Sequence, residues 1–219
     1  MKNKCIIFTG GSPIYCEAFG NEDFDDSFII AADSGCSQAE RLTLCGINVS
    51  VDILLGDMDS FDKTIALKRY PKAEFMSFPP EKDYTDTQLA VSVASEKGYK
   101  DIEIIGGTGN RADHYLANLA LLRKYAHEGV KLSINDGKNK ITYCKSGETV
   151  IVNDGRFKYF SLLPDGSGLS GVSIFGAKYP LENANIDRDI PITVSNEITS
   201  DICNIKVAEG DFFLILCSD

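Results

Sequence analysis

The sequence has no tryptophan, only two histidines and no apolar stretch long enough to cross a bilayer. A membrane-spanning helix needs roughly 20 consecutive apolar residues, and the longest runs here are stretches such as Phe-Phe-Leu-Ile-Leu-Cys, which ends at Cys217. The apolar part of the N-terminal segment stops at Gly10-Gly11 and is too short for a signal peptide. We therefore expect a cytoplasmic protein that has no membrane partner.

Positive charge is also scarce, because 22 lysines and arginines stand against 32 aspartates and glutamates, for a net charge of −10. No cluster of lysine and arginine offsets this excess. A protein with this balance is a poor candidate for non-specific binding to nucleic acid or to an anionic membrane surface. A phosphorylated substrate is not excluded, since a metal ion can supply the positive charge locally.

The seven cysteines form no C-x-x-C pair, and their number is odd. Most of them lie in apolar runs, which is typical of reduced, buried thiols in a cytosolic protein. The pattern therefore argues against a disulfide framework and against a zinc site.

The first 130 residues alternate between short apolar runs and longer amphipathic stretches. The predicted strands are 5–10, 28–33, 52–57, 74–79 and 101–107, and the predicted helices are 35–46, 64–70, 85–98 and 113–129. In the last of these helices, the residues at helical spacing are Leu116, Leu119, Ala120 and Arg123. Apolar strands that alternate with helices indicate a parallel sheet covered on both faces. We therefore predict an α/β domain over residues 1–130, with a Rossmann-like sheet.

After residue 130 the segments become shorter, richer in β-branched and aromatic residues, and separated by Gly, Asn, Asp and Pro. This pattern is typical of an all-β unit. The predicted strands are 131–136, 140–145, 149–154, 157–163, 171–176, 191–197, 203–210 and 211–217. We predict an all-β sandwich domain over residues 131–219, joined to the first domain without a long linker.

Carboxylates follow most of the predicted strands of the first domain. Asp33 ends the second strand, Asp57 ends the third with Asp59 just beyond it, Asp83 and Asp86 follow the fourth, and Asp113 follows the fifth. In an open parallel sheet these positions share the carboxyl edge, where such folds bind ligands. Two carboxylates about 4 Å apart repel each other by roughly 4 kcal/mol at an effective dielectric constant near 20. Such a cluster therefore needs separation, solvent, a shared proton or a cation.

Each acid also has a simpler interpretation. Asp33 or Asp113 can begin the helix that follows it, and the acids after the third strand can belong to a solvated turn. Thr85 and Gln88 fit a capping box, which places Asp86 in the first helical turn, where the helix dipole favours an acid. The convergence of acids from several loops nevertheless favours a hard cation such as Mg²⁺, which binds carboxylate oxygens, waters and substrate phosphates.

Two glycine-rich turns lie at the same predicted edge, at 8–13 after the first strand and at 106–111 after the fifth. Glycine allows backbone N–H groups to approach a phosphate closely. Neither turn is a P-loop or a G-x-G-x-x-G motif, so each can also be a simple turn. Arg111 adds a planar cation suited to phosphate, and His114 is either structural or a ligand contact. Together these residues predict Mg²⁺-dependent phosphoryl chemistry, in which an acid orients or deprotonates the attacking hydroxyl.

Three motifs, in their order and spacing, resemble the thiamine pyrophosphokinase family. They are Gly-Asp-Met-Asp-Ser (56–60), Lys-Asp-Tyr-Thr-Asp-Thr-Gln-Leu-Ala (82–90) and Gly-Gly-Thr-Gly-Asn-Arg-Ala-Asp-His (106–114). Ala-Ala-Asp-Ser-Gly (31–35) and Val-Ser-Asn-Glu (194–197) resemble further family motifs, so the likeness covers essentially the whole chain. The resemblance implies transfer of a pyrophosphoryl group from ATP to the hydroxyl of thiamine, giving thiamine diphosphate and AMP, with Mg²⁺ and a homodimer.

Matching positions carry the family's roles over to this chain. The resemblance implies that Asp57, Asp59 and Asp86 hold Mg²⁺ and that Arg111 and Asp113 complete the catalytic set. The residues expected to position the ATP phosphates and the attacking hydroxyl are Asp33, Lys82, Asp83, Thr85, Arg111 and Asp113, together with Gln88 and His114. The resemblance also places the catalytic cleft between the α/β domain of one subunit and the β domain of the other.

The thiamine side of the resemblance is carried by Ser195 and Asn196, which would contact the acceptor. The sequence departs from the family pattern at Ser34-Gly35, where Gly-Gly is usual, and at Asn110, where Gly is common. Without tryptophan, any aromatic packing on thiamine must come from Tyr or Phe. Three alternatives stay open: a pyrophosphokinase for another hydroxymethyl acceptor such as a pterin, a phosphohydrolase, and a non-catalytic module that senses nucleotide or thiamine.

Overall fold

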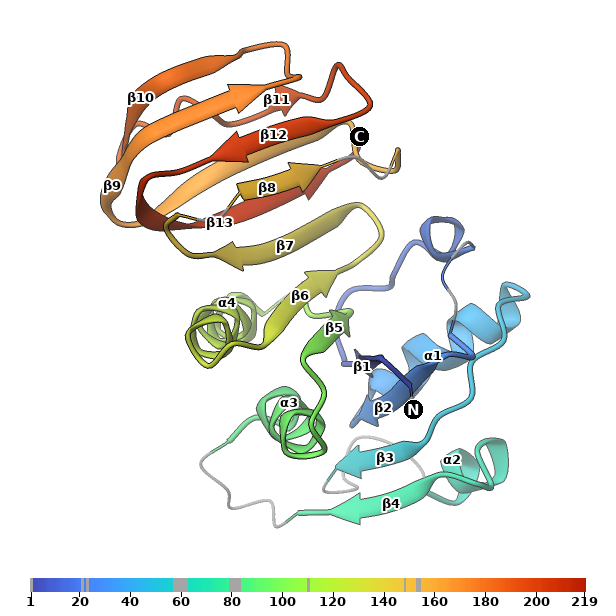
Figure 1. The fold of residues 1–219 in the computed structure, drawn as a ribbon. Coiled ribbons are helices and arrows are strands. Elements are labelled where there is room, and N and C mark those ends of the chain that lie inside the picture. Colours follow the sequence, from blue (N-terminus) through green and yellow to red (C-terminus); the bar gives the residue numbers. More distant parts are fainter. Residues whose placement is uncertain are drawn as a thin grey trace. The chain divides into compact units, whose positions relative to one another are not determined.

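The computed structural model describes residues 2–20, 22, 24–56, 63–78, 84–109, 111–147, 149–152 and 155–219. The chain divides into two compact units, Met1–Gly137 and Lys138–Asp219. Figure 1 shows the helices and strands of both units. Within the described residues, no helix is long and apolar enough to cross a membrane.

The first unit is built on a parallel sheet (Figure 1). Its strands are β1 (Lys4–Phe8), β2 (Ser27–Ala32), β3 (Ile53–Gly56), β4 (Glu74–Ser77), β5 (Asp101–Ile105) and β6 (Lys131–Asn135). They lie in the order β4-β3-β2-β1-β5-β6, and every neighbouring pair is parallel. The strand order reverses between β1 and β5, and ligands of open α/β sheets bind beside such a reversal at the carboxyl edge.

Helices connect these strands and cover both faces of the sheet (Figure 1). They are the 3-10 helix η1 (Cys16–Phe19) and the α-helices α1 (Gly35–Leu44), α2 (Lys63–Arg69), α3 (Asp86–Glu96) and α4 (Ala112–His127). One core packs Leu42 of α1 and Ala66 of α2 against Phe8 of β1, whereas α3 and α4 pack against each other. Because α1, α3 and α4 each follow the end of a strand, all three begin at the carboxyl edge.

These elements confirm the predicted strands and helices of the first domain, but the buried face of α4 differs from the predicted one. The buried residues of α4 are Asn118, Leu121, Leu122 and Tyr125, whereas Leu116 is 63% exposed. The two faces are offset by two positions, which is about 200° around a helix. The helix carries leucine and alanine on nearly every side, so spacing alone does not select the face that packs on the sheet.

Strand β6 lies in the first compact unit, which ends at Gly137, whereas the sequence predicts that the first domain ends at residue 130. It pairs in parallel with β5, from Asp101 beside Lys131 to Ile105 beside Asn135. Helix α4 brings the chain back to the edge of the sheet where β5 begins, so the strand that follows the helix runs parallel to β5. The composition of this short segment resembles that of the strands that follow, and composition therefore does not locate the boundary.

Among its described residues, the second unit contains strands and the turns between them, and no helix. They are β7 (Asn139–Cys144), β8 (Thr149–Val152), β9 (Tyr159–Phe175), β10 (Leu181–Asp187), β11 (Asn196–Glu197), β12 (Cys203–Lys206) and β13 (Glu209–Cys217). The order is β7-β13-β9-β12-β8, with β10 and β11 also paired to β9, and all pairs are antiparallel. The core includes Phe160, Leu169, Ile205 and Phe212.

Strand β9 joins two segments that the sequence predicts as separate strands, 157–163 and 171–176. Its first part pairs with β13, and its later part pairs with β12 and β10. Between them, Gly166 and Gly168 have φ values of 125° and 149°, and the register with β13 shifts. Glycine therefore bends the strand through an irregularity instead of ending it.

The segment 191–197 is mostly a turn, which corrects the predicted strand, and only its last two residues form β11. Thr193 is buried, and its hydroxyl donates to the carbonyl oxygen of Leu162 at 2.8 Å. Ile192 and Val194 are 60% and 54% exposed. The polar residue of this alternating pattern thus points inward and the apolar ones outward, because the threonine hydroxyl completes the hydrogen bonding of β9.

Candidate functional site

The loops at the carboxyl edge of the first unit are hydrogen-bonded to one another. The amide of Asp33, directly after β2, donates to the carbonyl oxygen of Leu55 in β3 at 2.7 Å. Beside the strand-order reversal, the amide of Ser12 in the first glycine turn donates to the carbonyl oxygen of Thr108 in the second at 3.2 Å. The loops after β1 and β5 are therefore neighbours in space, as the strand order requires.

The first glycine turn is packed backbone to backbone against its surroundings. A Cβ atom added at Gly11 would lie 2.1 Å from the carbonyl oxygen of Gly106. At the start of α1, a Cβ atom added at Gly35 would lie 2.1 Å from the carbonyl oxygen of Phe8. No side chain fits at either position. Glycine thus brings the turn after β1, the turn after β5 and the start of α1 into direct contact.

Two buried polar side chains support these turns, and both were missed by the sequence analysis. Gln38 of α1 donates from Nε2 to the carbonyl oxygen of Ser12 at 3.2 Å and accepts the amide of Ile14 at 3.3 Å. Asn118 of α4 donates to the carbonyl oxygen of Gly107 at 2.9 Å. Both satisfy loop backbone groups that would otherwise need another partner. Their only sequence signal is a polar residue inside the apolar face of a helix.

Asp33 adopts the left-handed conformation, with φ of 49°. Its amide bonds to Leu55, and its carbonyl oxygen accepts the amide of Cys36 at 3.4 Å. The N-cap of α1 is Ser34, so the simpler interpretation of Asp33 as the N-cap is wrong. A left-handed non-glycine residue costs about 1 kcal/mol, and the contacts on both sides of Asp33 hold it in this conformation.

Arg111 and Asp113 form a two-point ion pair at the start of α4. The distance is 3.2 Å from Nε to Oδ1 and 2.6 Å from Nη2 to Oδ2. The bond from Arg111 lowers the pKa of Asp113 to about 2, and the two side chains are 69% and 64% exposed. A guanidinium has five N–H donors, so this carboxylate leaves three that can point at a ligand oxygen. His114 follows in the first turn and is exposed.

Thr85 and Asp86 begin α3 at the same edge. Thr85 is the N-cap, and its Oγ1 accepts the backbone N–H of Gln88 at 3.2 Å. Asp86 therefore lies in the first turn, where a negative charge is favourable. These contacts confirm the predicted cap of α3, while the ligand roles of Asp86 and Gln88 stay predictions.

Four predicted site residues lie outside the described residues: Asp57, Asp59, Lys82 and Asp83. Of the three acids predicted to hold Mg²⁺, only Asp86 is described. In the described part of the chain, no group of three or more His, Cys, Asp or Glu side chains is placed to hold a metal ion. The Mg²⁺ site therefore stays a prediction from the sequence.

In the second unit, Asn196 has a structural role. It is 2% exposed, its Nδ2 donates to the carbonyl oxygen of Tyr179 at 2.8 Å, and its Oδ1 accepts the amide of the same residue at 3.0 Å. Ser195 is exposed, has φ of 58°, and donates its amide to Oγ of Ser161 at 3.1 Å. Of the two residues predicted to contact the acceptor, Ser195 is the one with a side chain directed away from the core.

Two family models match the chain. One described as "Thiamin pyrophosphokinase, catalytic domain" matches residues 23–134, and one described as "Thiamin pyrophosphokinase, vitamin B1 binding domain" matches residues 148–210. The first match includes most of β6, in agreement with the division into units.

Curated relatives and solved structures carry the same family name. Thiamine pyrophosphokinase of Bacillus subtilis (strain 168) is 34% identical over 221 residues, covering 100% of both chains. Thiamin pyrophosphokinase 1 of Caenorhabditis elegans is 26% identical over 171 residues, or 74% of this chain and 69% of its own.

Structural superposition supports the same assignment. The crystal structure of thiamine pyrophosphokinase from Bacillus subtilis superposes with a TM-score of 0.85 and 26% identity, covering 99% of each chain. That of thiamin pyrophosphokinase from Geobacillus thermodenitrificans superposes with a TM-score of 0.80 and 29% identity, covering 99% of this chain and 98% of its own. These matches confirm the resemblance, and the chain belongs to the thiamine pyrophosphokinase family.

Proposed function

We propose that this protein transfers a pyrophosphoryl group from ATP to the hydroxyl of thiamine, giving thiamine diphosphate and AMP, with Mg²⁺ as the cofactor. The observation that carries the proposal is the carboxyl edge of a chain of this family, where two glycine turns meet beside the starts of α1 and α4. Backbone N–H groups of glycine turns and the positive ends of helix dipoles both stabilise phosphate. A polyphosphate donor fits this edge.

The proposed metal ligands are Asp57, Asp59 and Asp86. Carboxylate oxygens are the ligands that Mg²⁺ prefers, so the chemistry of this set fits the ion. When bound, Mg²⁺ neutralises negative charge on the phosphates of ATP. In the proposal, the other residues that position ATP are Asp33, Lys82, Asp83, Thr85, Gln88, Arg111 and His114.

Asp113 orients Arg111 in this proposal and does not accept the proton of the attacking hydroxyl. A general base works best when its pKa lies near the working pH, and the pKa of Asp113 is about 2. The two-point contact instead fixes the guanidinium plane, and the remaining N–H donors of Arg111 bind phosphate oxygens. Asp86 orients the hydroxyl of the acceptor.

On the acceptor side, we assign the thiamine contact to Ser195, while Asn196 acts through the backbone of Tyr179. Tyr179 is 58% exposed, and its backbone donates one hydrogen bond to the side chain of Asn196 and accepts another from it. In a chain without tryptophan, this held tyrosine is the aromatic side chain that we propose packs on the thiamine rings.

The finer features of the expected architecture are part of the same proposal. They are a Rossmann-like first unit, a β-sandwich second unit, a homodimer with the cleft formed between the α/β unit of one subunit and the β unit of the other, and a cytoplasmic location. The support for the homodimer is the family membership. The support for the location is that the seven cysteines are free, as in reducing compartments.

Acceptor competition tests the proposal. Purified protein with ATP and Mg²⁺ is given thiamine, a hydroxymethyl-pterin, or both, and the products are separated and weighed by mass spectrometry. We expect diphosphorylated thiamine only, in amounts unaffected by the pterin. A diphosphorylated pterin, or ATP hydrolysis without any diphosphorylated acceptor, would overturn the proposed acceptor.

A further inference from the structure

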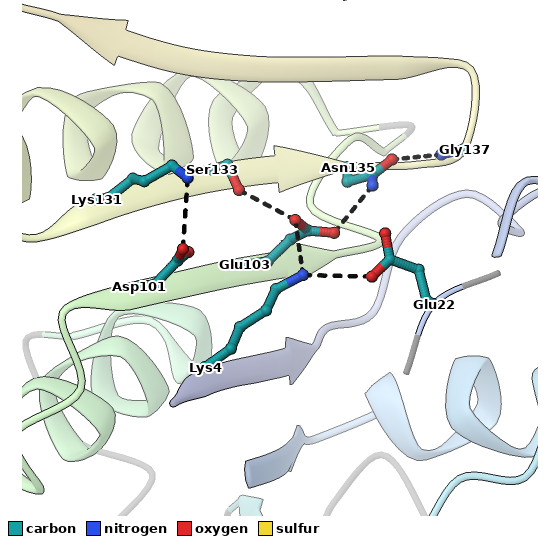
Figure 2. A network of polar contacts seen from close by, with 8 residues as sticks. All are labelled: Lys4, Glu22, Asp101, Glu103, Lys131, Ser133, Asn135 and Gly137. Atoms are coloured by element: carbon teal, nitrogen blue, oxygen red, sulfur yellow. Dashed lines mark hydrogen bonds and ion pairs between the residues drawn. The ribbon is translucent and has the colours of Figure 1, made fainter. Parts of the chain in front are cut away.

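Glu103 is a buried carboxylate in the middle of β5, surrounded by polar partners from two other strands (Figure 2). The residue is 2% exposed. Lys4 of β1 places Nζ 3.3 Å from its Oε2. In β6, Ser133 donates to Oε2 at 3.4 Å and Asn135 donates to Oε1 at 2.9 Å. A well-packed apolar side chain is often as stable as a buried ion pair, so this carboxylate calls for an explanation other than stability.

Asn135 connects Glu103 to the loop after β6. While its Nδ2 bonds to Glu103, its Oδ1 accepts the amide of Gly137 at 2.9 Å (Figure 2). Between them, Asp136 accepts the hydroxyl of Thr108 at Oδ2, 2.7 Å away, and its carbonyl oxygen accepts the amide of Tyr15 at 3.3 Å. Glu103 therefore holds the loop after β6 through Asn135, and Asp136 of that loop bonds to Thr108 of the second glycine turn and to Tyr15, two residues after the first.

Thr108 belongs to the second glycine turn and connects Asp136 to the first glycine turn. Its carbonyl oxygen accepts the amide of Ser12 at 3.2 Å and would lie 2.8 Å from a Cβ atom added at Gly11. Glu103 thus accepts a hydrogen bond from Asn135, the peptide bond joins Asn135 to Asp136, and the Asp136 carboxylate accepts the hydroxyl of Thr108. These contacts end where the two glycine turns meet.

We propose that Glu103 is a positioning residue for ATP. It holds the loop after β6 and, through Asp136 and Thr108, keeps the two glycine turns in the arrangement that binds phosphate. Glu103 touches neither substrate, and its effect reaches the nucleotide only through these contacts. The proposal rests on the proposed function in one respect, namely that ATP is the ligand of the glycine turns.

Asp101 provides a matched control on the same strand. It lies two residues before Glu103, on the same face, and pairs with Lys131 of β6 at 3.4 Å (Figure 2). Its side chain is 44% exposed, and Figure 2 draws its pair apart from the contacts of Asn135. Asp101→Asn therefore removes a carboxylate and an ion pair between β5 and β6 without altering the contacts of the loop.

The test compares wild type, Glu103→Gln, Asp101→Asn and Thr108→Val by calorimetric titration with ATP and Mg²⁺. Glu103→Gln is expected to bind ATP about tenfold more weakly, as after loss of one charge-assisted hydrogen bond, and Asp101→Asn within about twofold of wild type. In turnover, the KM for ATP should rise while the KM for thiamine is unchanged. ATP affinity of Glu103→Gln equal to that of Asp101→Asn would overturn the proposal, even with a lowered Tm.

Amide hydrogen exchange separates this proposal from the proposed function, because it needs no ligand. The amides of Ser12 and Gly137 should exchange faster in Glu103→Gln than in Asp101→Asn. If Glu103→Gln does not fold, Thr108→Val tests the far end of the same contacts and should accelerate exchange at Ser12. If the amide of Ser12 exchanges in Glu103→Gln, or in Thr108→Val where that variant replaces it, at the same rate as in Asp101→Asn, the role of Glu103 is overturned. If the wild type does not bind ATP, the proposed function is overturned. The exchange rates then still show whether Glu103 holds the glycine turns in place.

Discussion

Gly11 and Gly106 lie so close that a Cβ atom on Gly11 would stand 2.1 Å from the carbonyl oxygen of Gly106. This contact joins the loops after β1 and β5 at the point where the strand order reverses. Two backbone segments can surround a phosphate with their N–H groups only when no side chain separates them. The contact between these glycines is therefore central to the candidate nucleotide site.

Gly11→Ala should separate the two glycine turns. The added methyl group meets backbone atoms that cannot swing aside, so we expect the free energy of unfolding to fall by about 1–3 kcal/mol and ATP binding to weaken. Gly20→Ala is the control, because a Cβ atom there has only an ordinary contact, 3.7 Å from the carbonyl oxygen of Glu17. Urea denaturation and ATP titration measure both effects, and equal results for the two variants would contradict the account.

Asp113→Asn tests whether Asp113 orients Arg111 or acts as the base. The carboxylate with a pKa of about 2 is ionised at every pH where the enzyme works. An orienting role predicts that kcat/KM for ATP falls by one constant factor between about pH 5 and about pH 9, with the acidic limb of the pH–rate profile unmoved. Loss of that limb in the variant would show that Asp113 accepts the proton.

The buried thiol of Cys36 should affect how the free energy of unfolding changes at alkaline pH. Burial, followed by the nearby charge of Asp33, raises the pKa of its thiol from 9.0 to about 12. The folded state therefore holds this proton more tightly than the unfolded state, so the contribution is complete below pH 9 and is lost as the pH rises from about 9 toward about 12. In Cys36→Ala, the fall of unfolding free energy with pH should be shallower by about 1.4 kcal/mol per pH unit. Denaturation curves measured at a series of pH values give the free energy of unfolding for both proteins. Equal slopes against pH for wild type and Cys36→Ala would contradict the raised pKa of Cys36.

Substitutions at Ser195 and Asn196 should have different effects, the first on thiamine binding and the second on stability. Ser195→Gly relieves the strain of φ at 58°, so we expect it to leave stability unchanged or raise it by about 1 kcal/mol, while the KM for thiamine rises. Asn196→Ala leaves the backbone of Tyr179 without its partners and should lower the free energy of unfolding by about 1–3 kcal/mol. An unchanged thiamine KM in Ser195→Gly would remove Ser195 from the acceptor site.

The sequence predicts the first unit well because its signals are local. Apolar runs alternate with amphipathic segments, and the spacing of Thr85 and Gln88 in the sequence predicts the helix cap. The contact of Gly11 with Gly106 depends instead on β1 lying beside β5, which no short pattern specifies. Glu103 was missed for the same reason, since its only sequence signal is one acid inside the apolar run Asp-Ile-Glu-Ile-Ile, and its partners come from β1 and β6.

The second unit was harder to predict because glycine does not always mark a turn there. Gly166 and Gly168 are typical of a turn, yet they bend β9 within a continuous strand. β10 was not predicted at all, since Leu-Glu-Asn-Ala-Asn-Ile-Asp has only one β-branched residue. In 191–197 the alternation of apolar residues is real, but Thr193 faces inward because its hydroxyl bonds to β9. Hydrogen bonding overrides hydrophobic pattern at that position.

The most direct test of the central claim is product analysis of one reaction mixture. The protein is incubated with ATP, Mg²⁺ and thiamine, with and without EDTA, and the products are separated. We expect thiamine diphosphate and AMP in equal amounts; EDTA should abolish both products, and excess Mg²⁺ should restore them. Thiamine monophosphate with ADP, or transfer that survives complete chelation, would contradict the claim.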